Sequence, residues 1–567
     1  MIWVAFGLFV ILYLLLKSDI AEAVLLGMFS VALTVYVCYC LNINSSAIAC
    51  SMIGAIVSLG IYWCKNKGNL CKKIISEVFN NKNIILLIAL VLVLIADVIT
   101  LSHFRPLYDA EFNYYVSSIK YFFTTNSFGT GDTVVFDGFG SYTPINGLII
   151  SLVMKAFGEW NEGLIYISNC FLCQLCYFPF LSNGSKKTIF IRLMIVFTLP
   201  FLMLEDFFEG ITPECMETAL FFWCLFAIWN RNEEDGWFAD IKIVIGLSIL
   251  ILVKSPTILM VAVCYIIVIA FEMQKKELFS RKNILYVIPI AMLLLWKVYC
   301  RINHLAAYLH IGSKKALDFE YIISMIEERG FVFGEYIKMF CKETLNGGAI
   351  SVTGLIGIII CILPFAVIKN KDKLKKYKIF YLCSMVGMAC YCIGHLYLYL
   401  FVFSTPETQI MSAFVRYICG YLPACIFLAF YVIYDEKKVA INCMLVLAWS
   451  GVLNWGNLYH NFEESNYRLT HEEMHFYADE VSEKFDAFDV TFEEGDKICI
   501  FFDEQYYLIK QNLKYLSIPA KSYFVQIKDE NYRDTEEYLG HYDYYFLVKT
   551  SDDGMNLDDI VLLEKEE

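Results

Sequence analysis

Long runs of apolar residues, separated by short polar stretches, dominate the first 457 residues of the chain. The runs cover residues 2–16, 21–41, 46–63, 84–102, 144–157, 163–181, 188–204, 213–229, 241–253, 255–272, 283–300, 348–368, 378–400, 412–434 and 439–457. A helix needs about 20 residues to cross a bilayer. The pattern therefore predicts a polytopic α-helical membrane protein with about 13–14 spans. Two runs, 144–157 and 241–253, are short for a crossing.

The apolar pattern ends after Asn457, and a different pattern begins. It predicts strands at 497–502, 522–527 and 544–548, with helices at 504–516 and near 535–539. Strands that alternate with short helices indicate a small α/β domain. The chain thus divides into a multi-span domain, 1–457, and an α/β domain, 458–567. No glycine-rich phosphate loop follows any of these strands, so we expect no nucleotide there.

Basic residues set the expected orientation of the spans. They cluster in three connections: Lys65, Lys67, Lys72 and Lys73; Lys275, Lys276, Arg281 and Lys282; and Lys369, Lys371, Lys373, Lys375, Lys376 and Lys378. Short loops rich in Lys and Arg stay in the cytoplasm. The loops 103–143 and 301–347 and the α/β domain are then expected on the outer side.

This orientation requires an odd number of crossings between residues 143 and 275. In one solution the run 144–157 dips into the membrane without crossing, and 241–253 crosses. In the other, 144–157 crosses and 241–272 is a single span broken at Lys254-Ser255-Pro256. The first is favoured because it leaves Lys186-Lys187 in the cytoplasm.

Composition supports the membrane class and excludes others. Hydrophobic residues make up 58% of the chain, above the roughly 45–50% of soluble domains. The net charge of −13 argues against nucleic acid as a partner, since nucleic acids select basic surfaces. Most of the 21 cysteines lie in apolar runs, where they are interpreted as packing residues rather than a disulfide framework.

Two acids stand at the start of the first large outer loop, in Tyr108-Asp109-Ala110-Glu111. Carboxylates at the mouth of a span are costly unless water, a partner charge or a ligand meets them. The residues from Glu111 to Phe123 have helical spacing, which predicts an amphipathic helix lying on the outer surface with Asp109 at its start. Asp109 is then either a catalytic acid or only a helix cap.

Two cations lie within apolar sequence. A charge at mid-bilayer costs roughly 2.5–3.5 kcal/mol, so Lys254 should have a partner anion. Arg416 lies about one turn inside the run 412–434. Both side chains suit a phosphate, Arg by paired hydrogen bonds and Lys as a point charge. The alternatives are an internal salt bridge for Lys254 and snorkelling to the interface for Arg416.

Four further residues are accessory candidates. Glu407 precedes the last long run and could pair with Arg416 or contact an acceptor. Tyr142 closes the outer loop, and Glu214 opens the run 213–229, as does its neighbour Glu217. His395 lies in an apolar run, where a hydrogen-bonded packing role is the commoner interpretation.

This pattern resembles the GT-C superfamily of polytopic glycosyltransferases that use polyprenyl-phosphate sugars. The resemblance rests on Tyr108-Asp109-Ala110-Glu111, Tyr142-Thr143-Pro144, Ala156-Phe157-Gly158 with Asn161, Lys254-Ser255-Pro256 and the outer C-terminal domain. The chain is similar to large Gram-positive envelope proteins of this layout. There, too, a Glu such as Glu407 precedes a segment like Ser412-Ala413-Phe414-Val415-Arg416-Tyr417, and the tail carries a phrase like Glu537-Tyr538-Leu539-Gly540-His541-Tyr542-Asp543-Tyr544.

The resemblance implies roles for these residues. Asp109 would be the catalytic base, with Glu111 beside it, and Lys254 and Arg416 would lie near the lipid phosphate. Some relatives bind a divalent cation (Mg or Mn) at the loop acids and others do not, and the Asp-x-Glu spacing does not decide between them. The family usually has Tyr-Pro-Pro where this chain has Tyr142-Thr143-Pro144, which leaves the docking of the following helix open.

The sequence therefore predicts a glycosyltransferase in a bacterial cytoplasmic membrane. It would move a sugar from a polyprenyl-phosphate donor to an envelope glycan on the outer face, with membrane lipids around it. Two alternatives stay open. A transporter or flippase for lipid-linked glycans also needs buried cations, but no outer base. A polysaccharide polymerase that uses lipid-diphosphate donors would share the site.

Overall fold

The protein is described here from a computed structural model. The structure describes residues 1–66, 70–106, 111–136, 139–182, 211–231, 236–275, 281–306, 319–345, 357–403, 405–411, 414–434, 481–485, 487–488, 490–502, 507–526, 542–550 and 557–563. Asp109, the runs 188–204 and 439–457 and the helix expected near 535–539 lie outside these residues.

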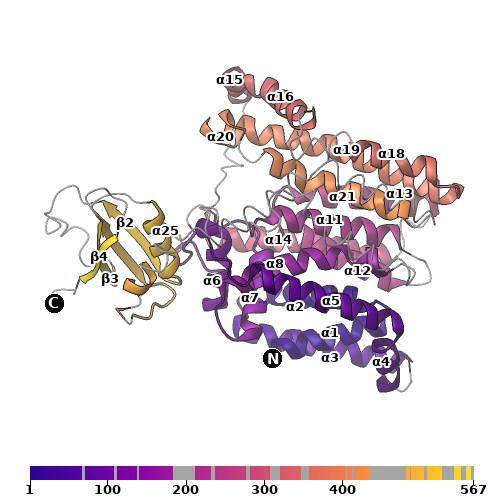
Figure 1. Ribbon diagram of the computed structural model, residues 1–567, viewed down its shortest axis with the longest axis horizontal. Coiled ribbons are helices and arrows are strands. Elements are labelled where there is room, and N and C mark those ends of the chain that lie inside the picture. Colours follow the sequence, from indigo (N-terminus) through magenta and orange to yellow (C-terminus); the bar gives the residue numbers. More distant parts are fainter. Residues whose placement is uncertain are drawn as a thin grey trace.

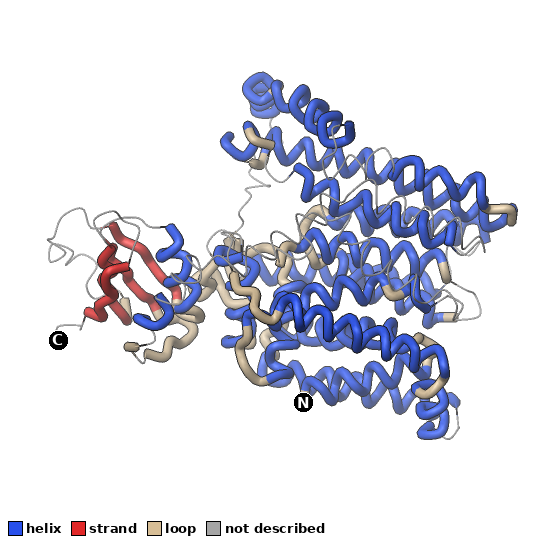
Figure 2. The backbone as a smooth tube through the Cα atoms, in the orientation of Figure 1, coloured by secondary structure: helices blue, strands red, loops and turns tan. Residues whose placement is uncertain are grey.

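Most of the described chain forms a body of packed helices, and a small sheet domain lies beside it (Figures 1 and 2). The helices are α1 (Ile2–Leu15), α2 (Ile20–Cys40), α3 (Ala47–Asn66), α4 (Leu70–Val78), α5 (Asn81–Leu101), α6 (Val116–Thr125), α7 (Ile145–Phe157), α8 (Glu162–Tyr177), α9 (Pro179–Ser182), α11 (Pro213–Trp229), α12 (Trp237–Leu250), α13 (Thr257–Lys275), α14 (Ile288–Ile302), α15 (Phe319–Arg329), α16 (Phe331–Leu345), α18 (Gly357–Val367), α19 (Lys371–Phe401), α20 (Thr405–Gln409) and α21 (Phe414–Tyr434). Shorter turns are η1 (Asn44–Ser46), η2 (Glu111–Tyr115) and η5 (Arg281–Val287).

Seven helical segments in the described part of the chain are long and apolar enough to cross a membrane. They are Ile20–Cys40, Asn44–Cys64, Asn81–Leu101, Thr257–Gln274, Asn283–Ile302, Lys371–Phe401 and Arg416–Ile433. A helix of 21 residues, such as α2, rises about 30 Å, which is the thickness of a bilayer's hydrocarbon core. The prediction of many membrane-length helices is confirmed to this extent.

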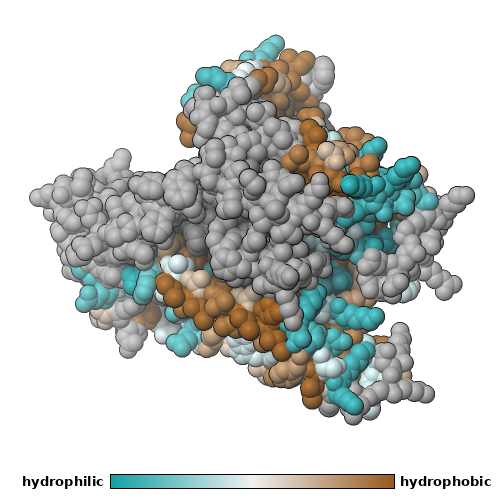
Figure 3. All heavy atoms as spheres, turned by 45° about the vertical axis from the view of Figure 1, so that its right-hand side comes forward, coloured by the Kyte–Doolittle hydropathy of each residue, from teal (hydrophilic) through white to brown (hydrophobic). Residues whose placement is uncertain are grey.

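These helices also carry apolar side chains on their outside. On α5, exposed residues include Leu87, Ile88, Val91, Ile95 and Ile99. Similar side chains are exposed on α3, α14 and α19. Figure 3 shows hydrophobic residues gathered in a band on the helical body, with hydrophilic residues on both sides of the band. Apolar surface of this extent needs a cover, such as lipid.

The helix α11 joins the two ends of the body. It begins at Pro213, and it ends near Arg231, whose guanidinium pairs with Asp240 of α12 at 2.7 Å and with Glu272 of α13. The sheet domain lies next to α6, at the end where α11 begins (Figure 1). We call this the sheet-domain end and the opposite one the far end. A charged cavity of about 250 Å³ lies at the far end, lined by residues that include Lys17, Lys82 and Lys242.

The two short runs behave differently from each other. Both ends of α7 lie at the sheet-domain end: Thr143 precedes its start, and near its other end Lys155 Nζ donates to Phe122 O and Asn126 Oδ1, each at 2.6 Å. α12 instead begins at Trp237 at the far end, where Lys242 of its second turn pairs with Glu22, and it ends at Leu250 beside the break. The two runs therefore lie differently within the helical body, and the choice between the two predicted crossing patterns stays a prediction.

The sheet domain has four strands in the order β2-β1-β3-β4. They are β1 (Lys497–Phe502), β2 (Lys521–Gln526), β3 (Tyr544–Thr550) and β4 (Leu557–Leu563), and α25 (Tyr507–Leu516) connects β1 to β2. β1 pairs in parallel with β2 and β3, whereas β4 pairs antiparallel with β3. The predicted strands and the first predicted helix of this domain are confirmed. The edge strand β4 was not predicted.

Candidate functional site

The two cations predicted from sequence meet at one carboxylate. Lys254 Nζ lies 2.6 Å from Oε1 of Glu214, and Arg416 Nε lies 3.0 Å from the same oxygen. The side chains of Lys254 and Glu214 are only 12% and 4% exposed. The internal salt bridge considered for Lys254 is therefore present, and three of the predicted site residues form one cluster.

A break between two helices places Lys254. α12 ends at Leu250, and Pro256 has no N–H with which to continue that helix. The hydroxyl of Thr257 spans the break, lying 2.7 Å from the carbonyl oxygen of Leu250 and 2.6 Å from that of Lys254. The Lys254 ammonium is thereby held at the sheet-domain end, facing the start of α11.

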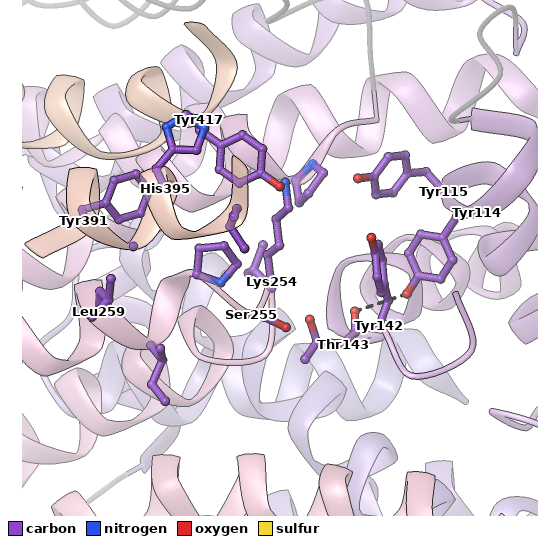
Figure 4. Close-up of a pocket in the computed structure, with 16 residues that line it drawn as sticks. Tyr114, Tyr115, Tyr142, Thr143, Lys254, Ser255, Leu259, Tyr391, His395 and Tyr417 are labelled. Carbon is purple, nitrogen blue, oxygen red and sulfur yellow. Dashed lines mark hydrogen bonds between the residues drawn. The ribbon is translucent and has the colours of Figure 1, made fainter. Parts of the chain in front are cut away.

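A cavity of about 210 Å³ lies in front of Lys254 (Figure 4). The polar part of its lining includes Lys254, His395 and the tyrosines Tyr114, Tyr115, Tyr142, Tyr391 and Tyr417. Ile258, Leu259 and Leu398 contribute apolar walls. A cation among aromatic rings in a small cavity suits an anionic group joined to a ring-shaped or apolar body.

The tyrosines approach Lys254 from two sides (Figure 4). Lys254 Nζ lies 4.3 Å from the centre of the Tyr417 ring on α21, a cation–π distance. Tyr115, on the η2 turn, faces Lys254 from the other side of the cavity. Burial raises the pKa of Tyr115, and the nearby Lys254 opposes that rise. The phenol of Tyr115 is therefore protonated at neutral pH and can act as a hydrogen-bond donor.

His395 has the packing contacts that its apolar context predicted. Its Nδ1 lies 3.4 Å from the hydroxyl of Tyr336, and its ring stacks on Tyr417 with the centroids 4.7 Å apart. The ring is almost fully buried, yet it also lines the cavity. His395 therefore supports the wall formed by α19 and α21.

The loop acids are only partly described. Glu111 is buried and accepts a hydrogen bond from the hydroxyl of Tyr166 at 3.1 Å. It is absent from the described lining of the cavity, whereas Tyr114 and Tyr115 of the same turn are present. The expected surface helix from Glu111 to Phe123 is wrong in one respect. The segment forms η2 and α6, but most of it is buried because α7 and the sheet domain cover it.

Of the accessory candidates Tyr142 and Glu407, only Tyr142 is among the described residues that line the cavity. Tyr142 lines the cavity and packs against Tyr114, with the ring centroids 5.0 Å apart. Glu407 lies half-buried on the short helix α20 and is not among the described residues that line the cavity. Its predicted pairing with Arg416 stays a prediction.

Sequence analysis missed several members of this cavity. Tyr115, Tyr391 and Tyr417 gave no signal because tyrosine is common in the chain, with 38 copies. Glu217, named with Glu214 from the sequence, is not among the described residues that line the cavity. It is buried one turn after Glu214, with one carboxyl oxygen that has no hydrogen-bond partner within the described structure.

In the described part of the chain, no three His, Cys, Asp or Glu side chains gather as a metal-ligand group. Asp109, the residue at which a metal was considered, lies outside that part.

A search of family models, of curated proteins and of solved structures found no match to this chain.

Proposed function

We propose that this chain is a membrane glycosyltransferase that moves a sugar from a polyprenyl-phosphate donor to an envelope glycan. The site would lie at the outer face of a bacterial cytoplasmic membrane, at the sheet-domain end of the helical body. The observation that carries the proposal is the Lys254 ammonium, which lines a small aromatic cavity while its counter-ion Glu214 is absent from the described lining.

The arrangement of charges supports this orientation. The basic start of α19, including Lys371, lies at the far end, where Lys376 Nζ donates to the carbonyl oxygen of Trp229 at the end of α11. Loops rich in Lys and Arg face the cytoplasm. The cavity at the other end would then face outward, on the side where sugars are carried by lipid phosphates rather than by soluble nucleotides.

A phosphate fits the cavity on electrostatic grounds. An ammonium in a setting with little water binds an anion more strongly than it would in bulk solvent. The volume of about 210 Å³ is below the roughly 300–1,000 Å³ of sites for drug-sized molecules. It can therefore hold a headgroup but not a whole polyprenyl lipid, whose chain must leave the cavity.

Residues of one cavity wall also reach the outside of the helical body. Ile258 lines the cavity and is also 49% exposed on the outside of α13. On the facing helix α19, Leu398 lines the cavity and its neighbour Tyr397 is exposed. An apolar chain that leaves between α13 and α19 would enter the exposed apolar surface, where the bilayer is expected.

The reaction would be a direct displacement at the anomeric carbon. The acceptor hydroxyl oxygen bonds to that carbon, and the bond from the carbon to the phosphate oxygen breaks with its electron pair going to the phosphate. Lys254 stabilises the departing phosphate, and Asp109 takes the hydroxyl proton. Glu111 is already hydrogen-bonded by Tyr166, which favours Asp109 as the base. A single displacement inverts the anomeric configuration.

Donor binding tests the phosphate site. Polyprenyl-phosphate affinity is measured with the protein in lipid nanodiscs, comparing wild type with Lys254→Met and with Lys242→Met. Lys242 is a matched control, since it is an ion-paired, mostly buried lysine at the far end. A lost charge-assisted hydrogen bond of about 1.5–3 kcal/mol should weaken binding at least tenfold in Lys254→Met only. Equal affinities for the two variants would contradict the proposal.

Sidedness is tested separately with two cysteine substitutions. Asp132 and Asp372 are exposed aspartates, in the outer loop and at the basic start of α19. A membrane-impermeant maleimide added to intact cells should label Asp132→Cys above the wild-type background and leave Asp372→Cys at that background. The reverse pattern would place the cavity in the cytoplasm, where this donor chemistry is not expected.

A further inference from the structure

Tyr515 of the sheet domain makes a buried contact with the helical body, in addition to the hydrogen bond between Glu494 and Tyr121 of α6. Tyr515, at the end of α25, is only 4% exposed, although it belongs to the sheet domain. Its hydroxyl donates to Oε1 of Glu162 at 2.7 Å and accepts from Nε1 of Trp160 at 3.1 Å. Glu162 and Trp160 lie at the start of α8, so the Tyr515 side chain is inserted into the helical body.

The same residue holds the segment that carries the cavity tyrosines. The ring of Tyr515 packs edge-on against Phe112 of η2, with centroids 5.7 Å apart. Lys120 of α6 donates from Nζ to the Tyr515 carbonyl oxygen at 2.9 Å and lies 4.2 Å from the centre of the ring. Tyr515 therefore contacts both the η2 turn and α6, which follow directly after Asp109.

One side of the η2 turn contacts the sheet domain, and the other side lines the cavity. Phe112 packs against the sheet domain, whereas Tyr114 and Tyr115 line the cavity opposite Lys254. Because the turn is only five residues long, a shift at Phe112 moves Tyr114 and Tyr115 with it. Burial, and next Glu162, hold the pKa of Tyr515 well above its ordinary value, so its hydroxyl stays a donor at any physiological pH.

We infer that Tyr515 is a positioning residue for the proposed transfer. Its hydroxyl, held by Glu162 and Trp160, fixes the ring on which the η2 turn packs. The turn, with Tyr114 and Tyr115, is thereby held against the phosphate side formed by α11, α13 and α21. The sheet domain is then part of the catalytic unit rather than an independent module. This inference rests on the proposed function, because it assigns the outer segment to the acceptor and its base.

The test compares Tyr515→Phe with Tyr523→Phe in the full-length protein in lipid. Tyr523 lies in the same domain, on β2, where its ring packs on Tyr542. Displacing reacting groups by fractions of an ångström to about 1 Å costs up to roughly 100-fold in rate. We expect kcat for polyprenyl-phosphate release to fall about 5- to 100-fold in Tyr515→Phe and to be unchanged in Tyr523→Phe. Polyprenyl-phosphate affinity should fall less than kcat, because Lys254 is untouched and only the Tyr114 and Tyr115 side of the cavity shifts.

A second measurement does not depend on turnover. Hydrogen exchange of the amides in residues 111–125 should be faster in Tyr515→Phe, with no change in α12 and α13. Unchanged exchange and unchanged kcat in Tyr515→Phe would overturn the inference. A parallel loss of donor affinity would also overturn it, since that would indicate general damage to the fold. If wild type itself transfers no sugar, the proposed function fails, and the exchange result alone decides whether Tyr515 fixes η2.

Discussion

Replacing Glu214 by Gln removes the charge on which two cations converge. Lys254 Nζ and Arg416 Nε lie 2.6 and 3.0 Å from the same carboxylate oxygen. Removing one partner of a buried ion pair costs about 3–5 kcal/mol, because the other charge stays buried without compensation. The Arg416 side chain is 33% exposed, so solvent screens its share, and we take the lower end, about 3 kcal/mol.

The same geometry predicts a smaller effect for Lys254→Met. In that variant Glu214 still has Arg416 within ion-pair distance, so the cost should be about 1–2 kcal/mol. The double variant Glu214→Gln/Lys254→Met leaves one cation where Glu214→Gln alone leaves two. It should therefore be no less stable than Glu214→Gln, with a coupling of about 1–2 kcal/mol between the substitutions.

Thermal unfolding followed by tryptophan fluorescence in nanodiscs measures these differences at one fixed scan rate. With an unfolding entropy of about 2.1 cal/mol/K per residue over 567 residues, 3 kcal/mol lowers the midpoint by about 2–3 °C. Glu22→Gln, which breaks the single Lys242 pair at the far end, is the control and should shift it less. Purely additive shifts, or a smaller effect for Glu214→Gln than for Glu22→Gln, would refute the shared-carboxylate account.

Three further predictions concern packing and titration. A Cβ at Gly163 would lie 2.2 Å from the carbonyl oxygen of Ser102, at the end of α5. Gly163→Ala should therefore push α8 away from α5 and lower the unfolding midpoint. An unchanged midpoint would contradict this close contact. Burial, and next the hydrogen bond to Glu494, raise the pKa of Tyr121 above its ordinary value of 10.0. Above pH 10 the folded protein therefore keeps a proton that the unfolded chain loses, so the stability that Tyr121 contributes is complete below pH 10 and falls as pH rises beyond it. The unfolding midpoint should decline less steeply above pH 10 in Tyr121→Phe than in wild type. Parallel declines in the two proteins would contradict this. Burial raises the pKa of Cys499 to about 12, so a maleimide at about pH 8 should modify Cys499 only after unfolding, as peptide mass spectrometry can show.

The chain's local patterns predicted a large part of this arrangement. Lys254 was identified because a charge before Ser255-Pro256 interrupts an apolar run, and the structure has a helix break at that point. Arg416 and Glu214 stand out as charges near the starts of apolar runs, and in the structure Glu214 pairs with both Arg416 and Lys254. Such charges stand out in sequence because their burial is costly unless they are paired.

Other features depend on contacts between distant segments. The helix from Glu111 to Phe123 looked like a surface helix because its cover includes Tyr515, about 400 residues away in the sequence. The strand β4 was missed because Asp558 and Asp559 interrupt its apolar pattern, which an edge strand tolerates since it pairs on one side only. The tyrosines around Lys254 come from η2, α19 and α21, and no local pattern brings those elements together.

Sugar transfer itself tests the central claim most directly. Purified protein in lipid is given a panel of polyprenyl-phosphate sugars and cell-envelope glycan, and release of free polyprenyl phosphate is followed for wild type and Asp109→Asn. The account predicts release by wild type with at least one donor, and none by Asp109→Asn although that variant still binds the donor. Equal release by the two proteins would contradict the role of Asp109. Absence of release with every donor, despite donor binding by wild type, would contradict the transferase and favour a transporter or a polymerase that uses lipid diphosphates.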